Sequence, residues 1–564
     1  MKLVLTALNA KFVHTNLAVR YLKEYTKDLD YECLIKEFSI NDRLENILQA
    51  LIEEKPEVIA FSCYIWNIEM VTKLATLLKK VNPRIEILFG GPEVSYDGRE
   101  FLEGVAGDYL IEGEGEEPFR QFVLYKLNRG RLQDISGFLY KDEKGKIQGR
   151  ESFNLLDMDM LPFPYKDELD FKNKIVYYEA SRGCPFNCKY CLSSTIKGVR
   201  FRNLDKVKEE LSILMERGVS LVKFVDRTFN ANRTYARKLW QFLKDVDTNT
   251  CFHFEISADL LTDEDIDLLS TVPKGRFQFE IGVQSTNEQV VQNINRTMNI
   301  EKLGYRVRQL RFANNIHLHL DLIAGLPGED YESFKESFNR VYSFEPHVIQ
   351  LGFLKLLKGS KMKEEEELWG MVYSPYPPYE IICNNYISYE ELVILKKVEA
   401  IVDKYYNSGN FNNILKFIMP NFNSAFDFFL KLAEFFQGKG YFNRSISGVD
   451  YYRVLIEFYK EYIGADTTIL KDIIKYDYFN VNKKTWIPDF LDKNVSKEEE
   501  KIIKDLLVNK YTMNTTKGLY IQGYSIDIKE YIAKGTLVHK KCFLVYNNED
   551  IVVKTFYSED IQSS

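Results

Sequence analysis

The sequence of 564 residues predicts an α/β protein with a doubly wound, Rossmann-like N-terminal domain, a partial (β/α)6 TIM-like barrel and a mostly helical C-terminal domain. Short apolar runs alternate with segments of helical periodicity over residues 1–126 and again over 174–354. After residue 380 this alternation gives way to longer helical segments. We expect domains at residues 1–150, 165–372 and 380–564.

The first alternating region predicts a parallel sheet, because each strand is followed by an amphipathic helix. Ligands of such sheets lie beyond the carboxyl ends of the strands, so the loops there are the candidate site. Asn16 is a residue type that caps helices. The expected strands are 2–8, 32–38, 58–65, 86–89 and 109–111, and the expected helices are 16–25, 43–54 and 68–81.

Residues 154–166 mark the crossing into the second domain, because Pro162 and Pro164 exclude a regular helix or a central strand. Six βα units follow, which predicts a partial barrel with its chemistry at the carboxyl ends of the strands. Pro375, Pro377 and Pro378 then interrupt the pattern. The expected strands are 174–180, 221–225, 251–256, 278–283, 317–324 and 348–354, with helices at 204–217 and 233–243.

The C-terminal region has a different pattern, with helices expected at 389–405, 424–436 and 449–462 and short strands at 519–522 and 542–546. No motif in this region indicates a function.

Composition argues against several classes of protein. Lys and Arg number 75 against 82 Asp and Glu, and no stretch concentrates positive charge, so no nucleic-acid partner is expected. The apolar run 3–8 is too short for a signal peptide and no long apolar stretch is present, so we expect no membrane partner and a cytoplasmic protein. Eight cysteines are too sparse for a disulfide scaffold.

Three of these cysteines, Cys184, Cys188 and Cys191, crowd into eight positions directly after an expected strand. Three thiolates on one short loop can hold three corners of an iron–sulfur cubane and leave the fourth iron open. A structural zinc site normally needs a fourth ligand, and no other Cys or His lies within about 50 residues. The alternative is that these three cysteines are spare or buried residues that bind no metal.

The spacing Cys184-x3-Cys188-x2-Cys191, with Tyr190 before the last cysteine, resembles the signature of the radical S-adenosylmethionine (SAM) superfamily. The resemblance implies a [4Fe-4S] cluster whose open iron binds SAM, and reductive cleavage of SAM to methionine and a 5′-deoxyadenosyl radical. It also implies an external electron donor such as a flavodoxin or ferredoxin. Tyr190 would lie near the adenine or pack at the barrel lip.

Segments at the ends of later strands resemble the same superfamily: 225–230 (VDRTFN), 255–259 (EISAD), 280–285 (EIGVQS) and 322–329 (LIAGLPGE). Acids in such segments are alternatively helix caps, and an arginine on a helix is alternatively an exposed surface residue. The SAM-binding residues that the resemblance implies are Tyr190, Asp226, Glu255, Gln284, Ser285, Arg296, Ile323, Gly325 and Leu326.

Two glycine loops follow strands of the first domain, Phe89-Gly90-Gly91-Pro92-Glu93-Val94-Ser95 and Glu112-Gly113-Glu114-Gly115-Glu116. Neither matches GxGxxG, which argues against a dinucleotide, and each is alternatively an ordinary tight turn. With the domain order, the loops resemble the cobalamin (B12)-binding domain of the cobalamin-dependent branch of radical SAM enzymes. The implied cobalamin-binding residues are Gly90, Gly91, Pro92, Glu93, Val94, Gly113, Glu114, Gly115 and Glu116.

The Asp-x-His-x-x-Gly motif of many cobalamin domains is not present. His14 lies in the expected loop, but Phe12 and Leu17 replace the Asp and the Gly, so His14 is better explained as a cap or packing residue. The lower face of cobalt stays unassigned; Tyr64 and Trp66 are candidates to cover it, with core packing as the alternative.

The resemblance implies a cobalamin-dependent radical enzyme, with methylation of an unactivated carbon or phosphorus centre as the leading hypothesis. A tRNA methylthiotransferase is the runner-up, but such enzymes hold a second cluster on three cysteines, and residues 1–150 contain only Cys33 and Cys63. A non-catalytic cobalamin or redox sensor is the third hypothesis. Within the family the chain is most similar to uncharacterised members with an additional C-terminal domain of unknown function. No catalytic residue and no substrate is assigned.

Overall fold

The computed structural model describes residues 1–150, 155–166, 171, 173–464, 466–481, 486–511, 518–547 and 552–562. The chain divides into two compact units, one of Met1–Pro346 and Gln350–Leu392 and the other of His347–Ile349 and Val393–Ser564. Among the described residues, no helix is long and apolar enough to cross a membrane.

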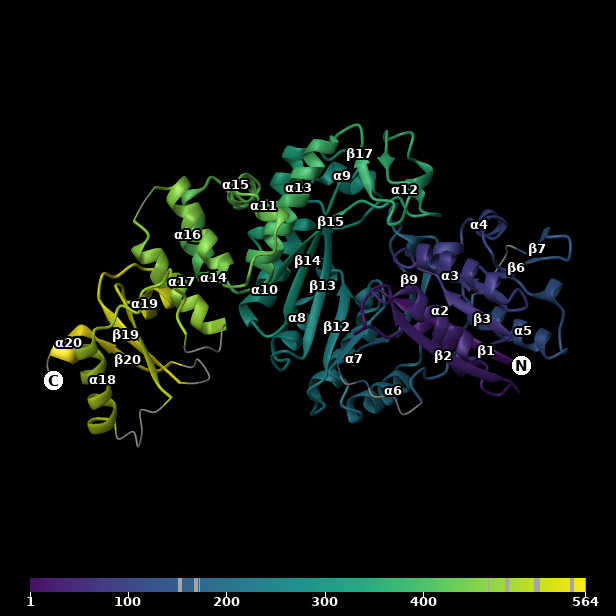
Figure 1. The fold of residues 1–564 in the computed structure, drawn as a ribbon, viewed down its shortest axis with the longest axis horizontal. Coiled ribbons are helices and arrows are strands. Elements are labelled where there is room, and N and C mark those ends of the chain that lie inside the picture. Colours follow the sequence, from purple (N-terminus) through teal and green to yellow (C-terminus); the bar gives the residue numbers. More distant parts are fainter. Residues whose placement is uncertain are drawn as a thin grey trace. The chain divides into compact units, whose positions relative to one another are not determined.

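The first unit begins with a seven-stranded sheet in the order β2-β1-β3-β4-β5-β6-β7 (Figure 1). The first five strands pair in parallel, and β6 and β7 extend the edge in antiparallel pairs. The strands are β1 (Lys2–Asn9), β2 (Glu32–Ser39), β3 (Val58–Ser62), β4 (Glu86–Gly90), β5 (Tyr109–Ile111), β6 (Phe138–Lys141) and β7 (Ile147–Arg150). The helices are α1 (Leu17–Tyr25), α2 (Leu44–Glu53), α3 (Ile68–Val81), α4 (Gly98–Gly104) and α5 (Glu116–Lys126).

Helices cover both faces of this sheet. Side chains of α2, α3 and α4 pack in one apolar core with one face, and those of α1 and α5 pack in another with the opposite face. The doubly wound prediction is therefore confirmed, as is the cap at Asn16, whose side chain accepts a hydrogen bond from the Val19 amide at 3.1 Å. The antiparallel strands β6 and β7 were not predicted.

The predicted crossing at residues 154–166 lies partly outside the described residues, since Asn154 is not among them. In the described part, residues 155–166, a single 3-10 turn at Met158–Met160 is the only regular element.

A six-stranded sheet in the order β15-β14-β13-β12-β11-β8 forms the partial barrel, which confirms the predicted (β/α)6 fold. Its strands are β8 (Ile175–Tyr178), β11 (Leu221–Phe224), β12 (Cys251–Ile256), β13 (Phe277–Gln284), β14 (His317–Ala324) and β15 (Val348–Phe353). Its helices are α6 (Leu204–Glu216), α7 (Arg233–Asp245), α8 (Asp263–Ser270), α9 (Glu288–Asn293), α10 (Ile300–Ala313) and α11 (Tyr331–Tyr342).

The barrel strands alternate in chemistry as well as in burial. Phe277, Phe279 and Ile281 of β13 are fully buried, whereas Glu280 and Gly282 between them line a pocket. Because successive side chains of a strand point to opposite faces, one face packs on the helices and the other carries polar groups inside the barrel.

The predicted strand 174–180 corresponds to β8, and a further strand that was not predicted, β9, begins just after it. β8 belongs to the barrel, whereas β9 (Ser181–Cys184) pairs in antiparallel fashion with β10 (Gly198–Phe201) and forms a separate hairpin, called the cluster hairpin below. After β15, the first unit continues through α12 (Lys361–Glu364), β16 (Val372–Tyr373) and β17 (Ile381–Cys383).

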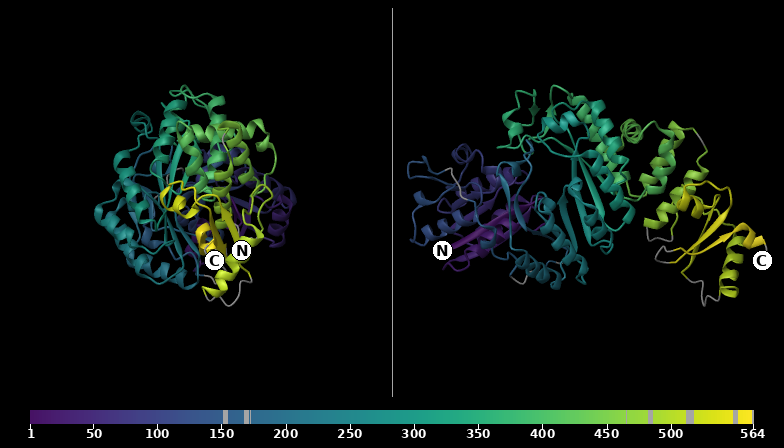
Figure 2. Two further views of the ribbon diagram at one scale, coloured as in Figure 1. Left: turned by 90° about the vertical axis from the view of Figure 1, so that its left-hand side faces the viewer. Right: turned by 180° about the vertical axis from the view of Figure 1, so that it is seen from behind.

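The second unit is mainly helical, as predicted, and ends in a three-stranded antiparallel sheet (Figure 2). α18 packs on this sheet through Ile503 and Leu507. α13 (Tyr389–Val402) spans the division between the units, and the other helices are α14 (Asn412–Ile418), α15 (Ala425–Gly438), α16 (Asp450–Tyr462), α17 (Thr468–Val481), α18 (Lys497–Asn509), α19 (Ile528–Lys534) and α20 (Ser558–Gln562). The strands are β18 (Tyr520–Tyr524), β19 (Cys542–Tyr546) and β20 (Val552–Tyr557), of which β20 was not predicted.

Candidate functional site

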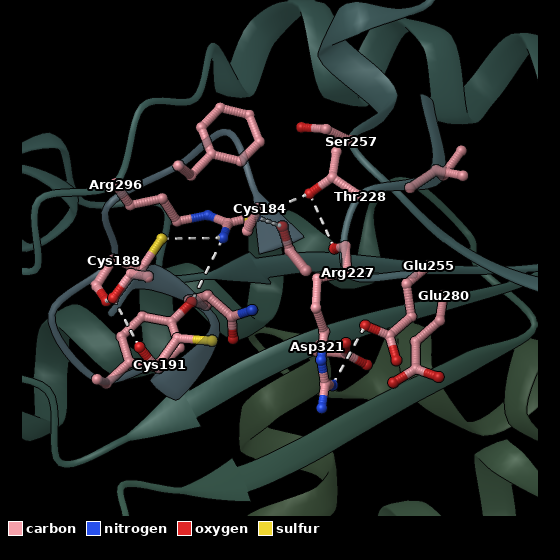
Figure 3. A pocket seen from close by; sticks show the side chains of 16 residues that line it. Cys184, Cys188, Cys191, Arg227, Thr228, Glu255, Ser257, Glu280, Arg296 and Asp321 are labelled. Atoms are coloured by element: carbon pink, nitrogen blue, oxygen red, sulfur yellow. Dashed lines mark hydrogen bonds and ion pairs between the residues drawn. The ribbon is translucent and has the colours of Figure 1, made fainter. Parts of the chain in front are cut away.

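A pocket of about 240 Å³ opens at the carboxyl ends of the barrel strands (Figure 3). All three cysteines of the predicted cluster loop line it, together with residues that follow or belong to β11, β12, β13 and β14. The structure therefore brings the cysteine loop and four strand-end segments to one place, where barrel enzymes carry their chemistry.

The cysteine loop is held by its own backbone and by the barrel. The Ser194 hydroxyl donates to the Cys188 carbonyl oxygen at 2.9 Å, and the Lys189 amide donates to the Ile294 carbonyl oxygen at 3.0 Å. Cys184 Sγ lies 3.6 Å from the Thr228 hydroxyl, and Arg296 Nη1 lies 3.8 Å from Cys188 Sγ. The three thiols are free, and the loop presents them to the pocket.

In the part of the chain that the structure describes, no three His, Cys, Asp or Glu side chains are grouped around the position of a single metal ion. Three free thiols on one loop, each lining the same pocket, would hold three irons of a cubane cluster and leave the fourth without a cysteine ligand.

The pocket also contains buried polar atoms without a hydrogen-bond partner: Gln284 Oε1, Asp321 Oδ1 and Arg296 Nε. Gln284 is only 8% exposed and has φ of +72°, at a point where the pairing of β13 and β14 shifts register. Non-glycine residues in this conformation concentrate at ligand sites, and unpartnered buried polar atoms are costly. These atoms fit a polar ligand that carries both donors and acceptors, as the amino acid and ribose parts of SAM do.

Ionisable groups surround the floor of the pocket. Arg227 Nη1 lies 3.7 Å from Glu255 Oε2, and Glu280 Oε2 accepts hydrogen bonds from Lys223 at 3.0 Å and from His253 at 2.9 Å. Burial opposes ionisation of Glu280, but the contacts with His253 and Lys223 prevail and lower its pKa to about 2. Burial raises the pKa of Glu255, and burial beside Glu280 and Glu255 raises the pKa of Asp321 far above its usual range.

Of the nine predicted SAM-binding residues, four line this pocket: Tyr190, Glu255, Gln284 and Arg296. Arg296 Nη1 also lies 3.3 Å from the Tyr190 hydroxyl, and Arg296 donates to the Gly282 carbonyl oxygen. The half-buried position of Arg296 in the pocket, between α9 and α10, differs from the exposed helix position that was the alternative explanation.

Asp226 and Ser285 do not line the pocket and have structural partners instead. The Asp226 carboxylate accepts from the Ala180 amide at 3.0 Å and from the Ser181 hydroxyl at 2.5 Å, and burial raises its pKa to about 7. The Ser285 side chain is fully buried and donates to Glu329 at 2.5 Å. A direct role of either residue toward SAM stays a prediction.

Ile323, Gly325 and Leu326 also lie outside the pocket lining, at the end of β14. Gly325 has φ of +86°, and a Cβ there would lie 2.8 Å from the Ile381 side chain, so the turn is packed tightly against β17. The Asn384 side chain donates to the Gly325 carbonyl oxygen at 2.9 Å. These contacts do not test the prediction that Ile323, Gly325 and Leu326 lie beside the adenine.

Sequence reasoning missed several pocket residues. The period-2 alternation of the strands was the available signal, because Glu280 lies two positions before Gly282 and four before Gln284. The lining residues that were not named individually, although their segments were, are Arg227, Thr228, Ile256, Ser257, Glu280 and Gly282, and those outside these segments are Phe186, Ser194 and Asp321.

The first predicted cobalamin loop, Gly90–Val94, is a tight turn at the end of β4. Gly91 has φ of +116°, and a Cβ there would lie 2.5 Å from the Cys63 carbonyl oxygen, so no other residue fits without strain. Pro92–Val94 forms a 3-10 turn in which Val94 is fully buried. The Glu93 carboxylate accepts from the Tyr379 hydroxyl and lies 3.7 Å from Lys358 Nζ.

The second predicted cobalamin loop, Gly113–Glu116, lies between β5 and α5. The Gly113 amide donates to Ser95 in the first loop at 3.1 Å, so the two loops are in contact. The carboxylates of Glu114 and Glu116 form ion pairs with Arg182 and Arg200 of the cluster hairpin. The acidic side chains thus bind the cluster hairpin. Contact of either loop with cobalamin stays a prediction.

His14 and the aromatic candidates for the lower cobalt face also follow strand ends of the first sheet. The His14 Nδ1 atom is hydrogen bonded to the Tyr177 hydroxyl at 2.7 Å, and burial lowers the His14 pKa. Tyr64 and Trp66 stack with ring centroids 4.4 Å apart, and Trp66 is 45% exposed. His14 therefore has a barrel partner, and a role of Tyr64 or Trp66 at the lower face of cobalt stays a prediction.

A second cavity, of about 590 Å³, lies in the second unit between α14, α16 and α19. Phe417, Tyr459 and Tyr531 line it, and Lys416 and Lys534 lie in the last turns of α14 and α19. Lysines at helix C-termini complement the helix dipole, which explains their position without a ligand.

Comparison with known protein families identifies two of the three regions. Residues 3–123 match the model of the B12 binding domain, and residues 178–341 match that of the radical SAM superfamily. The chain therefore carries a B12-binding domain followed by a radical SAM domain. Residues 367–551 match a family described only as a protein of unknown function, DUF4080.

Curated relatives of this chain include the 2-(S-pantetheinyl)-carbapenam-3-carboxylate methyltransferase of Streptantibioticus cattleyicolor, 28% identical over 53% of the chain and 47% of the relative. The cobalamin-dependent radical SAM methyltransferase TokK of Streptomyces tokunonensis is 27% identical over 53% of the chain and 47% of the relative. The chain thus spans about half the length of these relatives.

Solved structures share the fold. The cobalamin-dependent SAM radical enzyme OxsB with aqua-cobalamin bound has a TM-score of 0.59 at 14% identity, covering 89% of this chain and 75% of that chain. The radical SAM methyltransferase TsrM of Kitasatospora setae, with tryptophan and a SAM analogue bound, has a TM-score of 0.56 at 15% identity, covering 66% of this chain and 77% of that chain.

Proposed function

We propose that this protein is a cobalamin-dependent radical SAM enzyme that methylates an unactivated carbon of its substrate. The observation that carries the proposal is the single pocket onto which three free thiols and three unpartnered polar atoms open. The relatives named as methyltransferases, and the match to the B12 binding domain, favour methyl transfer as the outcome.

The chemistry supplied by the bound cofactors is reductive cleavage of SAM to a 5′-deoxyadenosyl radical and delivery of a methyl group. Cys184, Cys188 and Cys191 hold the cluster in this proposal. Arg296 binds the SAM carboxylate in this proposal, which is supported by its place in the pocket lining and by the 3.8 Å distance from its Nη1 atom to Cys188 Sγ.

Gln284 and Asp321 supply further polar contacts for SAM. The neutral form of Asp321, which burial and the neighbouring acids favour, would donate a hydrogen bond into the pocket. An electron donor, such as a flavodoxin or ferredoxin, and the substrate remain the partners that this activity requires.

The two alternative hypotheses receive less support. Methylthiotransferases are among the relatives, as in the ribosomal protein uS12 methylthiotransferase of Chlamydia pneumoniae, 22% identical over 52% of the chain. In the first domain, however, Cys63 is fully buried and Cys33 lies on β2, so the described residues offer no three-cysteine site there. A sensor would have no need of the unpartnered polar atoms beside the cysteines.

The test is formation of 5′-deoxyadenosine by anaerobically reconstituted protein with SAM and dithionite, measured by liquid chromatography and mass spectrometry. We expect the product from the wild type and from Cys383→Ala, a cysteine outside the pocket, and at least a 100-fold loss in the triple variant Cys184→Ala/Cys188→Ala/Cys191→Ala. Equal yields from the wild type and the triple variant would refute the proposal.

A second readout separates methyl transfer from other radical outcomes. With substrate, a methyltransferase of this kind yields one S-adenosylhomocysteine for each 5′-deoxyadenosine, and the former should depend on added hydroxocobalamin. If 5′-deoxyadenosine forms but S-adenosylhomocysteine does not depend on cobalamin, the radical SAM assignment stands and methylation is rejected.

A further inference from the structure

The loop Gly113–Glu116 and the cluster hairpin are joined by a buried network of charges. Arg182 Nη2 lies 2.8 Å from Glu116 Oε1 and 2.8 Å from Glu179 Oε2, and Arg182 Nη1 lies 3.4 Å from Glu114 Oε2. Arg200 pairs with the same Glu114. One guanidinium therefore contacts three carboxylates, two of which belong to the B12-binding domain.

The two carboxylates that the B12-binding domain supplies are well shielded from water, whereas the side chains of Arg182 and Arg200 are 19% and 25% exposed. Glu114 is 9% exposed and Glu116 is 5% exposed. Ion pairs on the surface contribute little, whereas removal of one partner from a buried pair leaves an uncompensated charge and is strongly destabilising. The position of the loop relative to the hairpin is consequently specified by charge as well as by shape.

Arg182 is also closely connected to the cluster loop. In the β9–β10 ladder Arg182 lies directly opposite Arg200, and Cys184 is two residues further along β9. Gly183 between them has φ of +104°, and a Cβ there would lie 2.2 Å from the Gly198 carbonyl oxygen. This close packing leaves little freedom in the backbone between Arg182 and Cys184.

The like charges of Arg182 and Arg200 would repel each other across the ladder if they were alone. The Glu114 carboxylate contacts both guanidinium groups. It also accepts a hydrogen bond from the Leu156 amide at 2.9 Å, which fixes its orientation. The regular pairing of the cluster hairpin thus depends on a carboxylate supplied by the other domain.

We propose that Arg182 is a positioning residue that couples the loop Gly113–Glu116 to the cysteine loop, so that cobalamin binding in the first domain and SAM binding at the cluster favour each other. The inference rests on the proposed function. In this proposal each ligand restrains one end of the same network. The second ligand then loses less conformational entropy on binding, so its affinity is higher. Coupling of this kind is reciprocal and typically amounts to 5–150-fold in affinity.

The test measures the dissociation constant of hydroxocobalamin for cluster-reconstituted protein, with and without saturating SAM, by absorbance titration under anaerobic conditions. For the wild type we expect SAM to tighten cobalamin binding at least 5-fold. In Arg182→Gln the ratio should fall to about 1. Arg182→Lys, which keeps the charge but not the fork of donors, should give an intermediate ratio.

Arg237→Gln is the matched control, because Arg237 also pairs with two carboxylates, Glu264 and Asp265, on the outside of the same barrel. This variant should keep the wild-type ratio. If Arg182→Gln fails to fold, Glu116→Gln removes one carboxylate of the network and should reduce the ratio as well.

The outcomes separate the two levels of the proposal. Wild type that binds both ligands with a ratio that Arg182→Gln leaves unchanged would overturn the coupling alone. Wild type that binds SAM but does not retain cobalamin would overturn the cobalamin part of the proposed function together with the coupling.

Discussion

Gly282 of β13 is a glycine because two candidate SAM ligands occupy the space where a Cβ would lie. A Cβ at this position would be 2.4 Å from Gln284 Nε2 and 3.2 Å from Arg296 Nη2. Both atoms belong to side chains that line the pocket, and Gln284 is only 8% exposed. In Gly282→Ala these side chains must move, and each is placed to contact SAM in our proposal.

We expect this movement to weaken SAM binding more than it lowers the stability of the fold. Ends of side chains can shift without a change of backbone, so we expect a free energy of unfolding within about 1 kcal/mol of the wild type. A hydrogen bond to a charged group contributes about 1.5–3 kcal/mol, so the loss of one such contact from Arg296 weakens SAM binding roughly 10–100-fold.

Equilibrium dialysis of SAM against cluster-reconstituted protein measures this affinity, and urea unfolding measures stability. Gly104→Ala is the control, because no heavy atom lies within 4 Å of its Cβ position. SAM affinity of Gly282→Ala within 2-fold of the wild type would refute the assignment of Gln284 and Arg296 as SAM ligands.

Three further substitutions test the surroundings of the site. Burial raises the pKa of Glu329 to about 7. Between about pH 4.3 and 7 the folded protein therefore keeps a proton on this carboxyl that the unfolded chain has released. As a result, this group lowers the free energy of unfolding by up to about 1.4 kcal/mol for each pH unit over that range. Glu329→Gln should remove that component, so its melting temperature relative to the wild type should rise between pH 5 and 7, and a pH-independent difference would contradict the reasoning. Gly91→Ala should lower the free energy of unfolding by about 1–3 kcal/mol through the backbone conformation alone, and further through the contact of the new Cβ with Cys63. An unchanged urea midpoint would contradict this description of the turn. Tyr379→Phe removes the hydroxyl that donates to the buried Glu93 carboxylate and should lower the free energy of unfolding in urea by about 1–3 kcal/mol. The control Tyr376→Phe, at a residue 69% exposed, should leave it unchanged. Equal effects of the two substitutions would reject a specific role for the Tyr379 contact.

The fold was predictable where local pattern decides it. β13 and β14 have apolar side chains on one face throughout, so their period of two identified them and the barrel that they form. The strands β6 and β7 escaped prediction because they extend an edge with mixed exposed and buried residues. β9 escaped prediction because only two residues separate it from β8.

The site was predictable only in part. The cysteine spacing and the residues Gln284 and Arg296 carry a signal in the sequence, and the structure brings them together. Glu114 and Glu116, in contrast, were predicted to contact cobalamin, and their ion pairs to Arg182 and Arg200 depend on residues more than 60 positions away. No local pattern reveals a partner at that separation, because the contact exists only once the two domains are packed.

The central claim is that one chain holds an iron–sulfur cluster in its barrel and cobalamin in its first domain. The direct measurement is the visible spectrum of anaerobically reconstituted protein after incubation with hydroxocobalamin and desalting, compared with Cys184→Ala/Cys188→Ala/Cys191→Ala. We predict near-stoichiometric cobalamin in both proteins and iron–sulfur absorbance in the wild type alone. Loss of all cobalamin on desalting would contradict the claim and leave a radical SAM protein whose first domain binds another ligand.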